Sequence, residues 1–322
     1  AVDPQYSDSD IWVVNDNTGR NRYPPRAGTD GTAVGTPLTA AEVKTILVEA
    51  FDVQRRARAQ VRRPLDNRAQ NTIVVVDTFG EVLGLVRGPD ALVDAIDAVP
   101  QKARTTAFFS NPQAAADLNG NPDAEVRSYV QKFRSFIGSP NALTGDIAWS
   151  LRSIGNLARP FYPDGQVGTP PGPLSLADGQ FSIFATGLQS RLITPDIVAH
   201  VNFILGASPT DVPRTCGRSP DVRPGYNRIN NGLTLFAGGV PIYRGGQLVG
   251  AVASSGDGDD QSDMIAFLGL VNASKKLGGS VNVPSTSIRS DTLLPLGNRL
   301  TFIACPFAPF VGTSDQNVCQ GF

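Results

Sequence analysis

The stretch LFAGGVPIYRGGQLVGAVASSG, residues Leu235–Gly256, indicates how the chain folds. Two β-rich runs, Gly239–Tyr243 and Gln247–Ser254, flank the pair Gly245-Gly246. Two glycines between such runs are typical of a type I′ hairpin turn, which requires positive φ. A phosphate-binding loop would need Lys-Ser or Lys-Thr after its last glycine, and this stretch has neither. We therefore predict a hairpin.

A second hairpin and a capped helix are predicted earlier in the chain. The runs Thr72–Val76 and Val82–Arg87 flank the turn sequence DTFG, and the continuous apolar run IVVV suggests burial on both faces. Residues 36–60 have apolar side chains at helical spacing, with Thr39 and Glu42 placed as a capping box. A short strand is also predicted for DIWVVN, against a sheet edge.

Two more helices complete the pattern. Residues 90–110 read as helical, and Pro100 is expected to break this helix or to start a new one at Gln101. Residues 259–279 form a third amphipathic helix, with Asp259 or Asp260 as its cap. The order helix, hairpin, helix, hairpin, helix predicts an α+β fold, in which helices pack on an antiparallel sheet.

Composition limits the possible functions. The chain has 322 residues, 41% of them hydrophobic, which is enough for one large domain or two small ones. The formal charge of −1 gives no electrostatic reason to expect nucleic acid or an anionic membrane as partner. No apolar run approaches the roughly 18 residues of a membrane span.

The ends of the chain suggest export to the periplasm or the medium. The sequence starts at Ala1, as it would after signal-peptide removal, and continues as an arm rich in Asp, Asn, Gly and Pro. In an oxidising compartment Cys305 and Cys319 would bridge and fix the tail. Pairings of Cys216 with either of them remain open. One histidine and no Cys-x-x-Cys pair argue against a structural zinc site.

Several motifs together resemble the GlcG-like, or haem-degrading, domain family. They are QKARTTAFF, AGGVPIYRGGQLVGAVASSG and DQSDMIAFLG, with IVVVDTFGEVLGLVRG before them. The matching positions are Lys102, Ala103, Arg104, Thr105, Gly238, Gly239, Pro241, Gly250, Ser255, Gly256 and Asp263. The resemblance implies a profilin-like fold, tetrapyrrole binding in several members and higher oligomers in some.

The resemblance divides the chain into five segments. The core comprises residues 37–111 and 231–279, preceded by an arm over residues 1–36. An insertion over residues 112–230 separates the two core segments, and a tail over residues 280–322 follows. Helices are predicted in the insertion at DAEVRSYVQKFRSFIG and ITPDIVAHVNFILG, with a Pro-rich loop containing Phe161 and Tyr162 between them. An arm and insertion of this kind commonly wrap a second copy, so we expect a homo-oligomer.

The resemblance also implies a haem-binding site with basic residues for the propionates. The residues expected at that site are Lys102, Arg104, Phe108, Phe236, Gly238, Gly239, Pro241 and Tyr243. In this interpretation the two glycines form a pocket wall that faces Arg104 or Lys102. No catalytic residue can be assigned.

The single histidine and a group of aspartates are the candidate metal ligands. His200 has the imidazole that haem iron accepts, although a histidine among apolar residues is more often a core or interface residue. Other axial candidates are Tyr162, Tyr243, Met264 and Lys102. The residues Asp257, Asp259 and Asp263 could hold calcium, or could simply cap a helix.

Three functions remain open. The favoured one is an exported protein that binds haem or a related tetrapyrrole. The second is an enzyme or accessory protein for a small carboxylate, in which Lys102, Arg104 and the Gly238-Gly239 backbone donate to the anion. The third is a structural, oligomer-forming protein.

Overall fold

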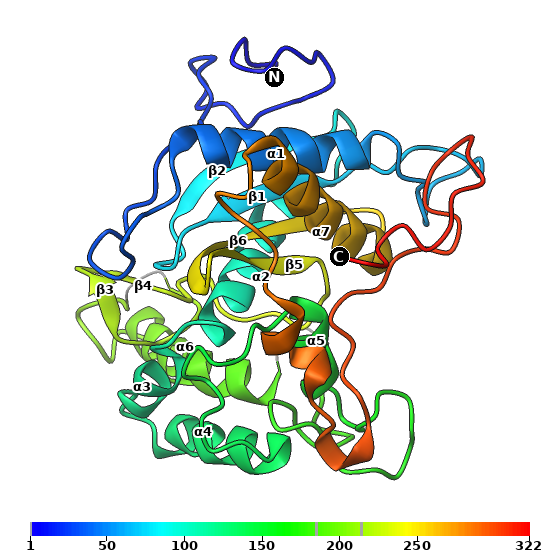
Figure 1. The fold of residues 1–322 in the computed structure, drawn as a ribbon. Coiled ribbons are helices and arrows are strands. Elements are labelled where there is room, and N and C mark those ends of the chain that lie inside the picture. The colour runs from blue at the N-terminus through cyan, green and yellow to red at the C-terminus, as the bar shows by residue number, and fades with distance from the viewer. Residues whose placement is uncertain (1, 184–185, 213–214) are drawn as a thin grey trace.

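A computed structural model describes every residue except 1, 184–185 and 213–214. Its main sheet has four antiparallel strands in the order β2-β1-β6-β5 (Figure 1). These strands are β1 (Thr72–Val76), β2 (Val82–Arg87), β5 (Gly239–Arg244) and β6 (Gln247–Ser255). Both predicted hairpins are thereby confirmed, and so is the α+β class. The type I′ turn is wrong, because Gly245 has φ +58° while Gly246 does not adopt positive φ.

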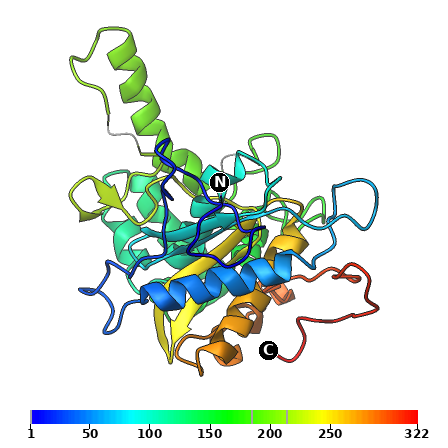
Figure 2. The same cartoon turned by 90° about the horizontal axis from the view of Figure 1, so that it is seen from above.

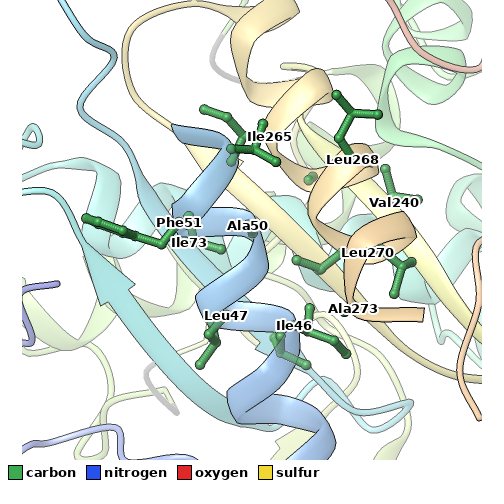
Figure 3. Close-up of a cluster of buried hydrophobic side chains, with 14 of the residues drawn as sticks. Ile46, Leu47, Ala50, Phe51, Ile73, Val240, Ile265, Leu268, Leu270 and Ala273 are labelled. Atoms are coloured by element: carbon green, nitrogen blue, oxygen red, sulfur yellow. The ribbon is translucent and has the colours of Figure 1, made fainter. Parts of the chain in front are cut away.

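Two helices cover one face of the sheet. They are α1 (Ala40–Gln54) and α7 (Asp259–Lys276), which pack against each other over the strands (Figure 3). Side chains such as Ile46, Ala50 and Ile265 are fully buried between the two helices and the sheet. The capping box of Thr39 and Glu42 is present. The predicted cap of α7 is wrong, because the cap is Gly258, and Asp259 and Asp260 lie in the first turn.

A single helix, α2 (Ala95–Phe109), covers the other face of the sheet. Pro100 lies inside it, so the expected break is wrong. A proline within a helix costs about 3 kcal/mol, because it removes a hydrogen bond and crowds the preceding turn. Burial of Val99, Ala103 and Ala107 against the strands offsets that cost.

The insertion folds around a hydrophobic core of its own. Its helices are α3 (Ala114–Asn119), α4 (Ala124–Ile137), α5 (Leu151–Leu157) and α6 (Gly187–Ile204), with a small hairpin of β3 (Asp221–Arg223) and β4 (Tyr226–Asn227). Both helices predicted in the insertion are confirmed. Their apolar side chains pack around the buried Trp149 and Phe133, and the end of α2 adds Phe108. The Pro-rich loop joins this core through Tyr162, whose ring lies edge-on to Phe136.

The arm and the tail are each bonded to the core segments, through the bridges of Trp12 with Arg87 and of Phe310 with Ala57. The arm forms a bridge rather than the predicted strand, with Trp12 bonded to Arg87 at the β2 edge. The tail contains the short 3₁₀ turns Thr286–Ile288, Ser290–Thr292 and Pro295–Gly297. The predicted disulfide between Cys305 and Cys319 is present, and Cys216 is free and exposed. No helix in the described part of the chain is long and apolar enough to cross a membrane.

Removing the disulfide is expected to destabilise the fold. A cross-link that closes a loop of this length contributes about 3 kcal/mol by restricting the unfolded chain. Replacing Cys305 and Cys319 by serine should therefore lower the free energy of unfolding by about 3 kcal/mol in urea titrations. Replacing the free Cys216 by serine is the control and should change little. An unchanged urea midpoint in the double variant would contradict the cross-link.

Candidate functional site

The motif residues converge at one end of the sheet, around a buried lysine. Lys102 on α2 is only 5% exposed, and its ammonium donates to the carbonyl of Ala237 at 2.7 Å. The nearest carboxylate is Asp259 on α7, at 3.9 Å. Burial lowers the pKa of Lys102, while Asp259 and Asp263 oppose that shift. The structure thus brings Lys102 to the glycine stretch, but the lysine is occupied by the protein's own atoms.

An arginine from the insertion completes this buried cluster. Arg152 on α5 forms an ion pair with Asp263, which is fully buried, and another with the half-exposed Asp260 at 2.7 Å. The Ala304 amide of the tail also donates to Asp263, at 3.0 Å. Burial raises the pKa of Asp263 to about 6, against the opposing effect of Arg152. The insertion and the tail thus fill the place where the core motifs meet.

The two glycines of the motif pack against the chain itself. A Cβ on Gly239 would lie 2.2 Å from the Thr106 hydroxyl, and one on Gly238 would lie 2.5 Å from the Ser254 carbonyl. Gly238 also has φ +116°, which disfavours other residues. The prediction of close approach is right, but the neighbour is the protein's own helix α2 and strand β6. The predicted pocket wall is therefore wrong.

Arg104 faces a different part of the molecule from Lys102. Its guanidinium donates to the Gly80 carbonyl at 2.7 Å, to Asn231 at 2.7 Å and to the Tyr226 hydroxyl at 2.9 Å. These bonds tie α2 to the β1–β2 turn and to the insertion. Arg104 is thus saturated with structural partners, and the structure does not bring it toward Gly238-Gly239 to form a carboxylate site.

The other predicted site residues are also separated. Phe108 is buried in the insertion core and Phe236 packs against it, while Pro241 lies on the edge strand β5. The three aspartates meet three different cations: Asp257 meets Arg62, Asp259 meets Lys102 and Asp263 meets Arg152. Among the described residues no three or more His, Cys, Asp or Glu side chains lie together as metal ligands, so the structure does not support the predicted calcium site.

His200 lies on an exposed helix rather than in a core. The C-terminal half of α6 projects from the body of the protein, as the light-green helix of Figure 2 shows. The imidazole is about half exposed, and its Nδ1 lies 2.7 Å from Asp211 in the returning loop. A carboxylate at one ring nitrogen fixes the orientation of the ring and leaves the other nitrogen for a ligand. Nε2 of His200 is that second nitrogen.

The surface around His200 is apolar. Ile197 and Ile204, three and four residues away on the same helix face, are 53% and 65% exposed. Val201 and Leu205 continue this surface and are 45% and 75% exposed. These four side chains and His200 are called the α6 face below. Residues 192–212 contain no lysine or arginine, so the α6 face does not suit an anionic membrane surface.

The α6 face fits haem by its chemistry. It offers an exposed imidazole held by a carboxylate, which is the donor that iron accepts, beside exposed apolar side chains. The alternative axial residues fit poorly: Met264 lies buried among α1, α7 and the sheet, and Tyr162 is buried with its hydroxyl bonded to Asn298. Burial also raises the pKa of Tyr243, which disfavours the phenolate that iron would need.

A family comparison supports the resemblance found in the sequence. The family model described as haem-degrading protein HbpS-like matches residues 205–270. The match covers β3 to β6 and two thirds of α7, and thus most of the second core segment, so the chain is similar to that family over these residues. It begins immediately after α6, and His200 lies outside it. No curated protein matches the chain significantly.

Two solved structures have weak overall similarity. The PduOC:heme complex aligns with a TM-score of 0.32 and 13% identity, covering 74% of this chain and 95% of its own. Klebsiella pneumoniae protein ORFY aligns with a TM-score of 0.34 and 14% identity, covering 74% and 90%. Scores this low do not establish a shared function.

Sequence reasoning named His200 but missed its surroundings. The run IVAHVNFIL indicates a helix with apolar residues on several sides, which usually means burial. Residues 192–205 contain one charged residue, Asp196, and this low charge also favours a buried helix. The partner Asp211 lies eleven residues on, in a loop, and no spacing rule connects it with His200.

Proposed function

We propose that this protein binds haem or a related tetrapyrrole on the α6 face, with His200 as the iron ligand. The observation that carries the proposal is the half-exposed His200 paired with Asp211 amid exposed apolar side chains. An unpartnered apolar surface of this kind generally marks a binding site. The match of residues 205–270 to a haem-degrading family supports the same ligand class.

Each residue of the α6 face has a role in this proposal. Asp211 accepts from Nδ1 of His200, which keeps Nε2 directed to the ligand and makes it more basic. Ile197, Val201 and Ile204 would supply apolar contacts to a bound ring and so remove apolar surface from water. Bound haem would supply a redox-active iron.

Haemin titration followed by visible absorption tests the proposal. The parent protein should bind one haemin per chain with saturation. His200→Ala should weaken binding by about 100-fold and change the spectrum, and Asp211→Asn should weaken it by about 10-fold, since partners of a metal-bound histidine contribute 10–100-fold. Neither residue is buried, so both variants should fold normally.

A matched pair of valine variants distinguishes haemin binding at the α6 face from non-specific hydrophobic binding elsewhere on the surface. Val201→Glu places a charge on the face and should weaken haemin binding. Val167→Glu changes an equally apolar residue that is 85% exposed in another loop, and should leave binding unchanged. Equal affinity of the parent and His200→Ala would overturn the proposal, and so would binding that never saturates.

Two further expectations remain proposals. We propose an oxidising compartment such as the periplasm or the medium, which the bond between Cys305 and Cys319 supports. We also propose a homo-oligomer, because the arm offers a surface to a second copy. Light scattering that gives the 34.0 kDa of one chain would contradict the oligomer.

A further inference from the structure

A cavity of about 670 Å³ lies at the end of the sheet opposite the Lys102 cluster. It is bounded by the β1–β2 turn, the β5–β6 turn and the end of α2, and also by Thr32–Val34 of the arm and β3 of the insertion. Its volume is within the range of about 300–1,000 Å³ that small-molecule sites occupy. Arm, core and insertion all contribute to this one cavity, although they are far apart in sequence.

Two buried residues of the cavity lining, Arg228 and Tyr243, have a side-chain donor without a hydrogen-bond partner among the described residues. Arg228 is 9% exposed, and its guanidinium donates to the buried Asp117 at 2.6 Å. Nε of Arg228 has no partner among the described residues. Arg228 therefore has donor capacity beyond its pairing with Asp117.

Tyr243 adds a second unused donor. It is 2% exposed, and its hydroxyl also lacks a hydrogen-bond partner among the described residues. Gln247 accepts from Gly35 at 3.3 Å through its oxygen, which leaves its amide N–H groups for a ligand. Asn111 donates only a long bond, at 3.4 Å to Thr78. Buried donors are seldom left unpaired in native proteins, so Arg228 and Tyr243 point to a ligand rich in acceptors.

We propose that this cavity binds a small carboxylate. A carboxylate offers about four acceptor positions and suits the planar donor edge of an arginine. The acidic residue in the cavity lining, Asp221, is exposed and already accepts from Gly225 at 2.8 Å, so it opposes an anion only weakly. The pair of Arg228 and Asp117 is neutral overall, which favours a mono- or dicarboxylate over a highly charged anion. This site is separate from the α6 face.

Calorimetric titration with acetate, oxalate, succinate and citrate tests the proposal, with succinamide as the uncharged control. At least one carboxylate should bind with a dissociation constant of about 1 mM or tighter, and succinamide should not bind. Tyr243→Phe removes only an unpaired hydroxyl, so the fold should persist. It should weaken carboxylate binding at least about 10-fold, the usual effect of losing a hydrogen bond to a charged group.

Control variants test whether the carboxylate binds in the cavity. Tyr162→Phe removes a buried hydroxyl outside the cavity lining and should bind the carboxylate like the parent. His200→Ala should also bind it normally, while Tyr243→Phe should retain haemin binding. The proposal is overturned if no carboxylate binds at millimolar concentration or if Tyr243→Phe binds like the parent. Loss of haemin binding in Tyr243→Phe would instead assign the cavity to haem and overturn both proposals.

Discussion

Replacing Arg152 by methionine is expected to lower the free energy of unfolding by about 3–5 kcal/mol at neutral pH. Asp263 is fully buried, and one of its oxygens already lacks a partner. Without Arg152 it would keep the Ala304 amide and the field of Lys102 but lose its ion pair. A buried charge deprived of its partner is among the most destabilising changes that a single substitution makes.

The effect of this substitution should grow with pH. Burial raises the pKa of Asp263 from 3.8 to about 6, so the folded protein holds this proton more tightly than the unfolded chain does. The contribution to stability is complete below the unfolded pKa and is lost as pH rises through the folded one. Arg152 lowers the folded pKa, so its removal raises that pKa further. The variant should therefore differ least from the parent at acid pH.

Urea unfolding of the parent and Arg152→Met at about pH 5 and about pH 8 measures this dependence. The double variant Arg152→Met, Asp263→Asn is the control, because it removes the uncompensated charge. It should be more stable than Arg152→Met at the higher pH and should show a flatter pH profile. If Arg152→Met lowers the free energy of unfolding by less than about 1 kcal/mol at the higher pH, the ion pair from the insertion does not stabilise the buried Asp263.

The second large effect is expected at Gly239. A valine there would force its Cβ to within 2.2 Å of the Thr106 hydroxyl and 3.1 Å of the Lys102 carbonyl. One neighbour is backbone in the middle of α2, so the strain cannot be relieved by a side-chain rotation alone. We expect Gly239→Val to cost about 3 kcal/mol, the upper range for overpacking a core.

Thermal unfolding distinguishes this packing effect from a loss of ligand binding. Gly246→Ala is the matched control, because a Cβ at that turn position meets nothing within 4 Å. Thr106→Ala removes the closest contact and should recover part of the loss when combined with Gly239→Val. A Gly239→Val protein as stable as the parent would show that the glycine has a role other than packing.

Local sequence rules were sufficient for the sheet and its helices. The two hairpins, the capping box of Thr39 and Glu42 and the apolar periodicity all depend on neighbours within a few residues, and all are found in the structure. The prediction at Pro100 was wrong because the local preference of proline was weaker than the packing of α2 against the strands. At Gly246 the error concerns only the turn type, because two glycines permit more than one kind of hairpin turn.

The candidate sites were harder to predict because distant segments build them. Lys102 and Gly238 were placed together correctly, but Arg152 enters from the insertion, and no spacing rule links it to Asp263. The cavity beside Tyr243 needs the arm and β3, which carry no motif. His200 was predicted as a possible iron ligand, whereas the exposure of its helix depends on how α6 leaves the body.

Locating the iron in crystals grown with haemin tests directly whether His200 is the iron ligand. Anomalous scattering at the iron edge gives the position of the metal without any assumption about its ligand. We expect iron coordinated by Nε2 of His200, with the ring lying over Ile197, Val201 and Ile204. Iron at the cavity beside Tyr243, at Lys102 or nowhere in the crystal would contradict it.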